Sequence, residues 1–156
     1  MTTLERPSTA TPLTKAQAEA ALRAAFAAVV WRAPTSNEIT LLLAHSAEEV
    51  GQWQHMHGNN WGFVTTKGNR PYFRLPNDAH LYRWYATPDE GARDWLLAIR
   101  DNWPDAWALI DSGDPTAYVH ALKTTGRYGA YFEADEATYA AGVSRLFKQF
   151  SAAETV

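Results

Sequence analysis

The sequence of 156 residues contains no cysteine, which excludes disulfide bridges, thiolate metal sites and thiol catalysis. The sequence also lacks an excess of either charge, because 14 Lys and Arg nearly balance 17 Asp and Glu, and the net charge is -3. Since a protein that neutralises phosphates needs a basic surface, nucleic acid is not expected as a partner. Charged residues are 20% of the chain and hydrophobic residues 46%, which favours a globular domain and no membrane insertion.

A secretory signal is absent as well. Residues 1–12 are rich in Thr and Pro and contain no charged stretch followed by an apolar run. We expect residues 1–12 to form a flexible tail and residues 13–152 to form a single domain, long enough to bury a core without disulfides or a structural metal. A target outside the membrane would then be reached by a route other than the Sec pathway.

Aromatic residues, by contrast, are abundant. Seven Trp, seven Tyr and six Phe make up 13% of the chain, more than a core of this size needs. The surplus indicates that some rings line a groove, where the apolar face of a sugar can lie on an aromatic ring. Trp95, Trp103 and Trp107 have near-helical spacing, and we expect them to pack between helices.

Helix-start signals organise the first third of the chain. A capping box at Thr14 predicts a helix that ends near Trp31, and a second capping box at Thr35 predicts a helix that stops at Gly51. The second helix is apolar nearly all round, so we expect it to be the central buried helix.

The remaining sequence predicts a small β lobe and then more helices. Residues 62–86 contain three short β-prone pieces separated by turn residues, at 63–66, 72–75 and 81–85. Helix starts follow at Thr87, Asp114 and Asp135. The predicted fold class is therefore α+β and predominantly helical, with a small antiparallel β lobe inserted after the central helix. A cleft can form between two such lobes.

Glu49 is the strongest candidate for chemistry. It lies at the C-terminal end of the predicted buried helix, where apolar surroundings and the negative end of the helix dipole both disfavour the ionised carboxylate. Its pKa should therefore be raised. Cleavage of a glycosidic bond requires a carboxylic acid that is still protonated near neutral pH, because the leaving oxygen must receive a proton.

Several motifs resemble, in order, those of glycoside hydrolase family 73, the bacterial endo-β-N-acetylglucosaminidases. The apolar helix ends in Ala-Glu-Glu-Val-Gly at 47–51, and Asn-Trp-Gly follows at 60–62. The resemblance continues in Tyr-Arg-Trp-Tyr at 82–85, Ala-Leu-Lys at 121–123, Gly-Ala-Tyr-Phe at 129–132 and Tyr-Ala at 139–140. It implies a lysozyme-like fold, Glu49 as the general acid, and the alternating GlcNAc and MurNAc polymer of peptidoglycan as the substrate.

The resemblance also implies further site residues. The family's functional tyrosine falls on either Tyr128 or Tyr131, because the stretch before Gly129 is longer than usual, and Tyr131 is preferred. For sugar binding we expect Asn60, Trp61 and Tyr85, with Asn59 as a further candidate. The alternative is that these aromatic side chains belong to the core and the asparagines end a turn.

The second catalytic group stays open. Family members often carry a second acid in the β lobe, where this sequence offers only Asp78, in a predicted turn. Without a second carboxylate, the 2-acetamido group of the substrate or the MurNAc 6-hydroxyl could attack instead, the latter as in lytic transglycosylases. A muramidase acting on the same polymer is a further alternative.

No cofactor is implied. His55 and His57 have metal-like spacing but no flanking ligand at a recognisable distance, so we expect no metal site. The expected partner is the peptidoglycan glycan strand, which the protein would reach through phage lysis, a virion or an injected effector. A different class of function is a non-catalytic, wall-binding or structural component of a phage tail or secretion apparatus.

Overall fold

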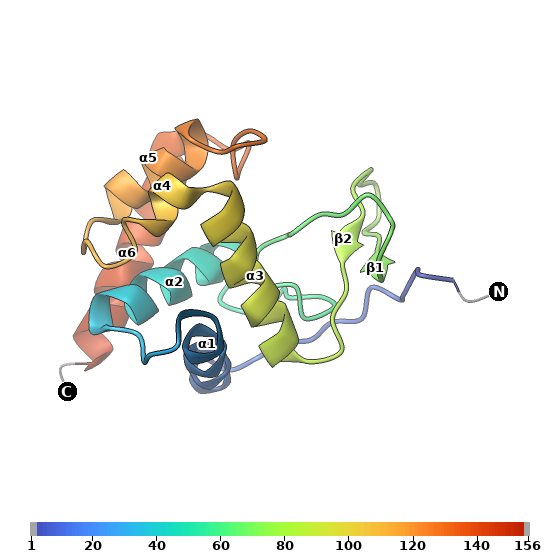
Figure 1. Ribbon diagram of the computed structural model, residues 1–156, viewed down its shortest axis with the longest axis horizontal. Coiled ribbons are helices and arrows are strands. Elements are labelled where there is room, and N and C mark those ends of the chain that lie inside the picture. Colours follow the sequence, from blue (N-terminus) through green and yellow to red (C-terminus); the bar gives the residue numbers. More distant parts are fainter. Residues whose placement is uncertain (1–2, 155–156) are drawn as a thin grey trace.

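The computed structural model describes residues 3–154, and over that range the chain forms six helices and one two-stranded sheet (Figure 1). The helices gather in one lobe, and the strands lie in a smaller β lobe beside it (Figure 1). In chain order the elements are α1 (Lys15–Val30), α2 (Ser36–Glu49), β1 (Tyr72–Phe73), β2 (Tyr82–Arg83), α3 (Pro88–Asn102), α4 (Pro104–Trp107), α5 (Pro115–Thr124) and α6 (Glu136–Glu154).

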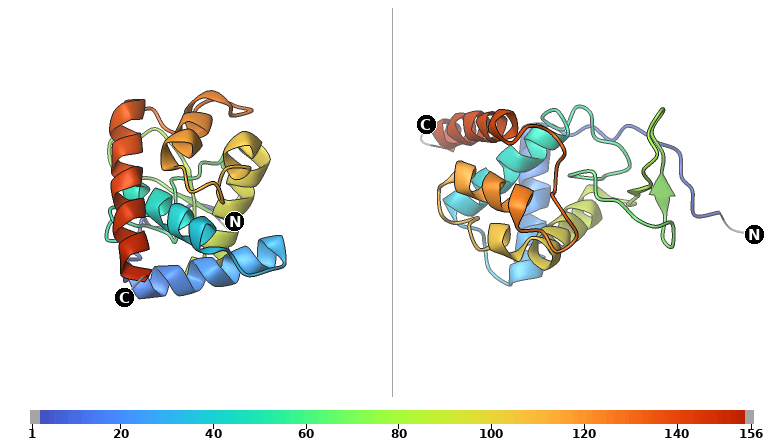
Figure 2. Two further views of the ribbon diagram at one scale, coloured as in Figure 1. Left: turned by 90° about the vertical axis from the view of Figure 1, so that its left-hand side faces the viewer. Right: turned by 90° about the horizontal axis from the view of Figure 1, so that it is seen from above.

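Helix α2 runs through the middle of the helical lobe, as predicted. It packs against α1 and α6 (Figure 2), and every residue from Glu38 to Ala47 is buried. Its capping box is complete, since the Thr35 hydroxyl accepts from the Glu38 backbone and the Glu38 side chain accepts from the Thr35 backbone. The helix ends at Glu49, two residues before Gly51, which adopts a left-handed backbone with φ of 56°.

The other predicted helix starts are also confirmed. Thr14 opens α1 with a complete capping box, and Thr87 and Asp114 cap α3 and α5 through hydrogen bonds to backbone amides. Asp135 accepts from the backbone amide of Thr138 at the start of α6. The short helix α4 was not predicted.

The β lobe is smaller than the sequence predicts. Strands β1 and β2 pair antiparallel, but the first β-prone piece contributes only an isolated bridge between Thr65 and Tyr82. Phe63 has φ of 55°, a left-handed conformation that a continuous strand cannot accommodate. The antiparallel lobe after the central helix is thus confirmed, with two strands in place of three.

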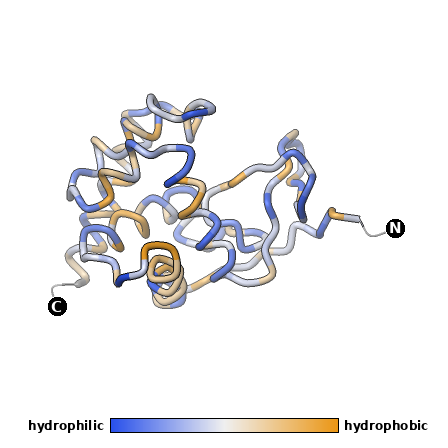
Figure 3. Tube along the Cα trace, viewed as in Figure 1, coloured by the Kyte–Doolittle hydropathy of each residue, from blue (hydrophilic) through white to orange (hydrophobic). Residues whose placement is uncertain are grey.

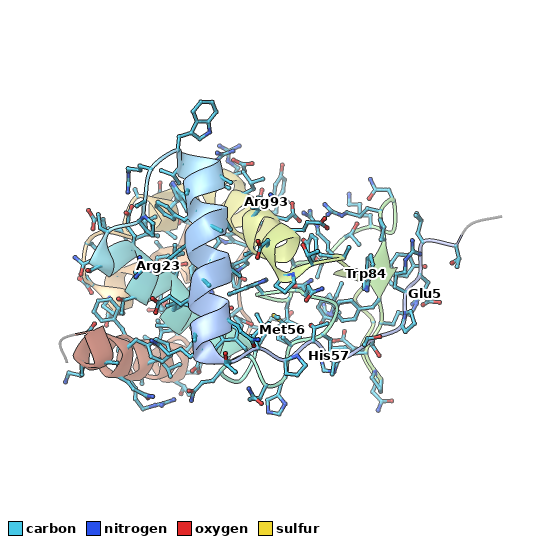
Figure 4. All side chains as sticks on the ribbon, turned by 90° about the horizontal axis from the view of Figure 1, so that it is seen from below. Glu5, Arg23, Met56, His57, Trp84 and Arg93 are labelled. Carbon is cyan, nitrogen blue, oxygen red and sulfur yellow. The ribbon has the colours of Figure 1, made fainter. Side chains whose placement is uncertain are left out.

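The N-terminal segment, for which a flexible tail was predicted, makes backbone hydrogen bonds to the rest of the chain. Met1 and Thr2 lie outside the described residues, but the segment from Leu4 onward is bonded to both lobes. Leu4 and Arg6 exchange backbone hydrogen bonds with Tyr72, whereas Thr9 and Thr11 bond to residues 58 and 56. Figure 4 shows the course of this segment, with Glu5 and Trp84 at its β-lobe end and Met56 and His57 nearer α1.

Hydrophobic residues concentrate in the helical lobe, where α1 and α2 meet the other helices (Figure 3). One core cluster extends from Ala18 in α1 to Phe150 in α6. No helix within residues 3–154 is long and apolar enough to cross a membrane.

Candidate active site

Glu49, the last residue of α2, has its carboxyl group enclosed between helices. The hydroxyl of Tyr139, on α6, donates a hydrogen bond to Oε1 of Glu49. Burial raises the pKa of Glu49 to about 7, and the neighbouring charge of Glu48 acts in the same direction, whereas the Tyr139 hydrogen bond partly opposes both. The acid is therefore substantially protonated near neutral pH.

Glu48 and Glu49 are adjacent in sequence but have different surroundings. The Glu48 carboxylate lies against Gly142 of α6, where an added Cβ would come within 2.3 Å of Oε1. Successive helix residues point about 100° apart, which separates the two side chains around α2. The close approach to Gly142 makes Glu48 a packing neighbour of α6 and a suitable control for experiments on Glu49.

Two buried tyrosines, Tyr118 and Tyr139, and the half-buried Tyr131 lie near this end of α2. Burial raises the pKa of Tyr118, Tyr131 and Tyr139 well above the ordinary value, and the charge of Glu49 raises it further. All three phenols therefore remain neutral hydrogen-bonding groups.

Tyr131 is fixed by two hydrogen bonds. Its hydroxyl donates to the Gly62 carbonyl at 2.7 Å and accepts from Nε1 of Trp95 at 2.7 Å. Tyr131 thus connects the loop after α2, helix α3 and the loop before α6. Tyr128 is 88% exposed instead, so the two candidate tyrosines occupy different environments.

His45 was not singled out from the sequence, yet it lies at the centre of this aromatic cluster. It precedes Glu49 by one helical turn, is fully buried, and its Nδ1 is 2.7 Å from the Tyr118 hydroxyl. Its ring centroid is 4.7 Å from that of Tyr131. Burial lowers the pKa of His45 to about 3, so the imidazole is neutral at physiological pH.

A cleft of about 900 Å³ opens between the β lobe and the helical lobe. Its walls are formed by residues 62–70 with His80 and Arg83, by the end of α3 with Trp103, and by the loop before α6 with Tyr128, Tyr131 and Glu133. Glu49 is not part of this lining. Its link to the cleft is electrostatic: burial raises the pKa of Tyr131, which lines the cleft, and the charge of Glu49 raises it further.

Asn60 is fully engaged by backbone groups. Its amide nitrogen donates to the carbonyl oxygens of Val64 and Arg83, both at 2.9 Å, and its amide oxygen accepts from the backbone amides of Gly62 and Val64. The side chain therefore holds the loop after α2 against the β lobe. No donor or acceptor capacity is left over for a sugar.

The other predicted sugar-binding residues also lie in the interior. Trp61 is fully buried and donates to the Pro88 carbonyl, and Asn59 donates to the Tyr85 carbonyl. Tyr85 is buried and donates its hydroxyl to Asp94. None of the three lines the cleft, and Trp61 and Tyr85 are buried, as the core alternative for the aromatic side chains expected.

The aromatic residues that do line the cleft include Trp103 and Tyr128. Trp103 is half-buried, and its Nε1 donates to the Gly129 carbonyl at 3.1 Å. Its expected packing role is only part of its environment, since it also faces the cleft. Pro104, the first residue of α4, explains why α3 ends just before this tryptophan, because a residue that precedes proline disfavours the helical conformation.

Two further carboxylates lie near the lobe boundary. Asp78 accepts from the Tyr82 hydroxyl at 2.5 Å and from His80 at 2.8 Å, and these bonds lower its pKa to about 2. Glu133 lines the cleft from the loop before α6. Burial raises the pKa of Tyr82, and the charges of Asp78, Glu133 and Glu49 raise it further.

Within residues 3–154, no group of three or more His, Cys, Asp or Glu side chains is arranged to hold a metal ion. Comparisons with protein-family models, with curated proteins and with solved structures found no match to this chain. The candidate site is therefore defined by its own geometry: a half-buried acid with a raised pKa, a cluster of neutral tyrosines, and a cleft that one of these tyrosines lines.

Proposed function

We propose that this protein is a lysozyme-like glycosidase that cleaves β-1,4 links in peptidoglycan glycan strands, with Glu49 as the general acid. The observation that carries the proposal is the raised pKa, about 7, of a carboxyl group that ends a buried helix beside a cleft between two lobes. A surface carboxylate at its ordinary pKa would be almost fully ionised at neutral pH and would have no proton to give.

The proposed reaction breaks the bond between the anomeric carbon and the leaving oxygen. The Glu49 carboxyl transfers its proton to that oxygen as the bonding electron pair moves onto it. A nucleophile adds its oxygen to the anomeric carbon, and the oxocarbenium-like charge is lost. A water or hydroxyl nucleophile gives up its proton to the Glu49 carboxylate or to solvent water. Water gives direct hydrolysis, the 2-acetamido oxygen gives a cyclic intermediate that water then opens, and the 6-hydroxyl of MurNAc gives an anhydro sugar.

Tyr131 and Tyr139 would serve different purposes in this reaction. Tyr139 donates to Glu49 and so stabilises the carboxylate left after proton transfer, which keeps the pKa of the acid from rising further. Tyr131 lines the cleft and is held rigidly by Gly62 and Trp95, so it would orient the sugar next to the acid. Trp103 and Tyr128 would provide stacking surfaces for further sugars.

Asp78 and Glu133 are the two candidates for a second catalytic carboxylate that would act together with Glu49. Asp78 is held ionised with a pKa of about 2 while Glu49 stays protonated, and two acids with pKa values pushed apart are typical of an acid and its charged counterpart. Glu133 lines the cleft directly. Asp78→Asn and Glu133→Gln, assayed side by side, test this: a loss of about 100-fold in kcat is expected for the residue that acts, and a small change in both variants would favour attack by a substrate group.

The basic test is the clearing of a suspension of purified cell walls, followed by turbidity. We expect clearing by the wild type and no clearing by Glu49→Gln. The control variant Glu48→Gln should also clear the suspension, because the side chain of residue 48 packs against Gly142 of α6. Circular dichroism would check that both variants fold. Equal clearing by Glu49→Gln, or clearing by none of the proteins, would contradict the proposal, and the second result would favour a non-catalytic wall-binding role.

A further inference from the structure

The β-lobe wall of the cleft is basic, although the whole chain is slightly acidic. Lys67, Arg70 and Arg83 line this wall, with His80 beside them. Glu133 is the only acidic residue of the lining, and it lies on the opposite side, in the loop before α6. We call Lys67, Arg70 and Arg83 the basic wall. A cleft lined mostly by one sign of charge focuses the field on what enters it.

One internal carboxylate partly neutralises the basic wall. Asp94 of α3 accepts from Nη1 of Arg83 at 2.8 Å and lies 3.5 Å from Nη1 of Arg70. A second bond, from Nε of Arg83 to the Thr65 carbonyl, fixes that guanidinium in place. One negative charge is thus shared by two guanidinium groups, and the basic wall as a whole stays positive.

Arg70 has the most unused hydrogen-bonding capacity in the basic wall. Its guanidinium lies over the Tyr85 ring, 5.5 Å from the centroid, which holds it in position without using its donors. Its Nε is buried and has no hydrogen-bond partner among the described residues. Because Nε is buried, a ligand in the cleft would bond to the Nη donors of this guanidinium, whose side chain is 36% exposed and whose Nη1 lies 3.5 Å from Asp94.

We propose that the basic wall is a carboxylate-binding subsite, with Arg70 as its specificity-determining residue, and that it selects anionic glycan strands over neutral ones. This inference rests on the proposed function, because it names which strands the same cleft prefers. A planar guanidinium matches a carboxylate with two parallel hydrogen bonds. In peptidoglycan, carboxylates come from two sources: the lactyl group of a peptide-free MurNAc residue and the termini and side chains of stem peptides.

Binding to the inactive Glu49→Gln protein tests the subsite without cleavage. Three probes distinguish the sources: a neutral GlcNAc oligomer, a peptide-free GlcNAc-MurNAc strand of equal length, and the same strand with stem peptides. We expect at least one anionic probe to bind roughly tenfold tighter than the neutral oligomer at low salt, and this preference to fall as salt rises. Equal affinity for all three probes would overturn the subsite.

Variants of Arg70 separate a specific contact from general attraction. In the Glu49→Gln protein, Arg70→Gln is expected to remove most of the roughly tenfold preference and to weaken anionic probes far more than the neutral oligomer, whereas Arg70→Lys keeps part of the preference. Arg145→Gln removes the same charge from the exposed face of α6, away from the cleft lining, and is the matched control. An equal loss in Arg145→Gln would overturn the proposal.

The two proposals fail in different ways. If the wild type cleaves glycan strands but shows no preference for carboxylates, the subsite is wrong and the glycosidase stands. If the wild type cleaves no strand while Glu49→Gln binds anionic probes in an Arg70-dependent manner, the subsite stands as a binding site and the glycosidase is wrong.

Discussion

Replacing Glu49 by Gln should stabilise the protein above neutral pH while it removes the proposed acid. Burial raises the pKa of Glu49 from 4.5 to about 7, so the folded protein holds a proton that the unfolded chain releases between these pH values. Protonated Glu49 therefore makes its full contribution to the free energy of unfolding below about pH 4.5, and this contribution is lost as the pH rises through about 7.

The size of the effect follows from the same two values. A pKa difference of about 2.5, from 4.5 to about 7, corresponds to about 3 kcal/mol of free energy of unfolding once Glu49 is ionised in the folded state. Gln is neutral at every pH and keeps an acceptor for the Tyr139 hydroxyl. The stability curves of wild type and Glu49→Gln should therefore converge in acid and separate by up to about 3 kcal/mol in mild alkali.

Urea unfolding followed by tryptophan fluorescence, at several pH values between about 4 and 9, measures this separation. Glu48→Gln removes one negative charge from the same helix end and controls for the helix dipole, which is worth about 0.3 to 1 kcal/mol. A constant difference between wild type and Glu49→Gln across the whole pH range would refute the reasoning, as would a less stable Glu49→Gln protein above pH 7.

Three further changes test the surroundings of the acid. Tyr139→Phe removes a hydrogen bond that lowers the pKa of Glu49, so the pH above which cleavage declines should move upward in a pH-rate profile, and an unchanged limb would contradict this role. Asn60→Ala leaves several buried backbone groups unpaired and should cost about 3 kcal/mol in urea unfolding; a loss below about 1 kcal/mol would show that the loop does not depend on it. Gly91→Ala would place a Cβ 1.8 Å from the Asn59 carbonyl oxygen and should destabilise by about 3 kcal/mol or more, and a thermal midpoint equal to that of the wild type would contradict this close approach.

Much of the helical lobe was predictable because its signals are local. Thr14 and Thr35 each form a capping box with a residue three positions later, and the apolar run after Thr35 has one outcome in a small domain, burial. The position of Glu49 follows from that run and from Gly51. Its raised pKa was therefore predictable from neighbours along the chain.

The partners of Glu49 were harder to predict from the sequence, because they lie on elements that are distant along the chain. Tyr139 is 90 residues away in sequence; the Tyr-Ala pair at 139–140 belongs to the resemblance, but no local pattern pairs this tyrosine with Glu49. The roles of Asn60 and Trp61 also depend on tertiary contacts: the same side chains would be free to bind sugar if the loop after α2 were turned outward. The ordering of the N-terminal segment likewise depends on exposed backbone groups near Met56 and Tyr72, which the segment itself does not reveal.

The central claim is that this site cleaves glycan strands by proton donation from Glu49, and the products of purified peptidoglycan test it most directly. Mass spectrometry of the soluble products should show fragments with a new GlcNAc reducing end in the wild type and in Glu48→Gln, and none in Glu49→Gln. A reducing MurNAc end would leave Glu49 as the proposed acid but show that the other glycosidic bond is cut. An anhydro-MurNAc end would also leave Glu49 as the acid but show that the MurNAc 6-hydroxyl is the nucleophile. Identical fragments from wild type and Glu49→Gln, or no fragments from folded wild-type protein, would contradict the account.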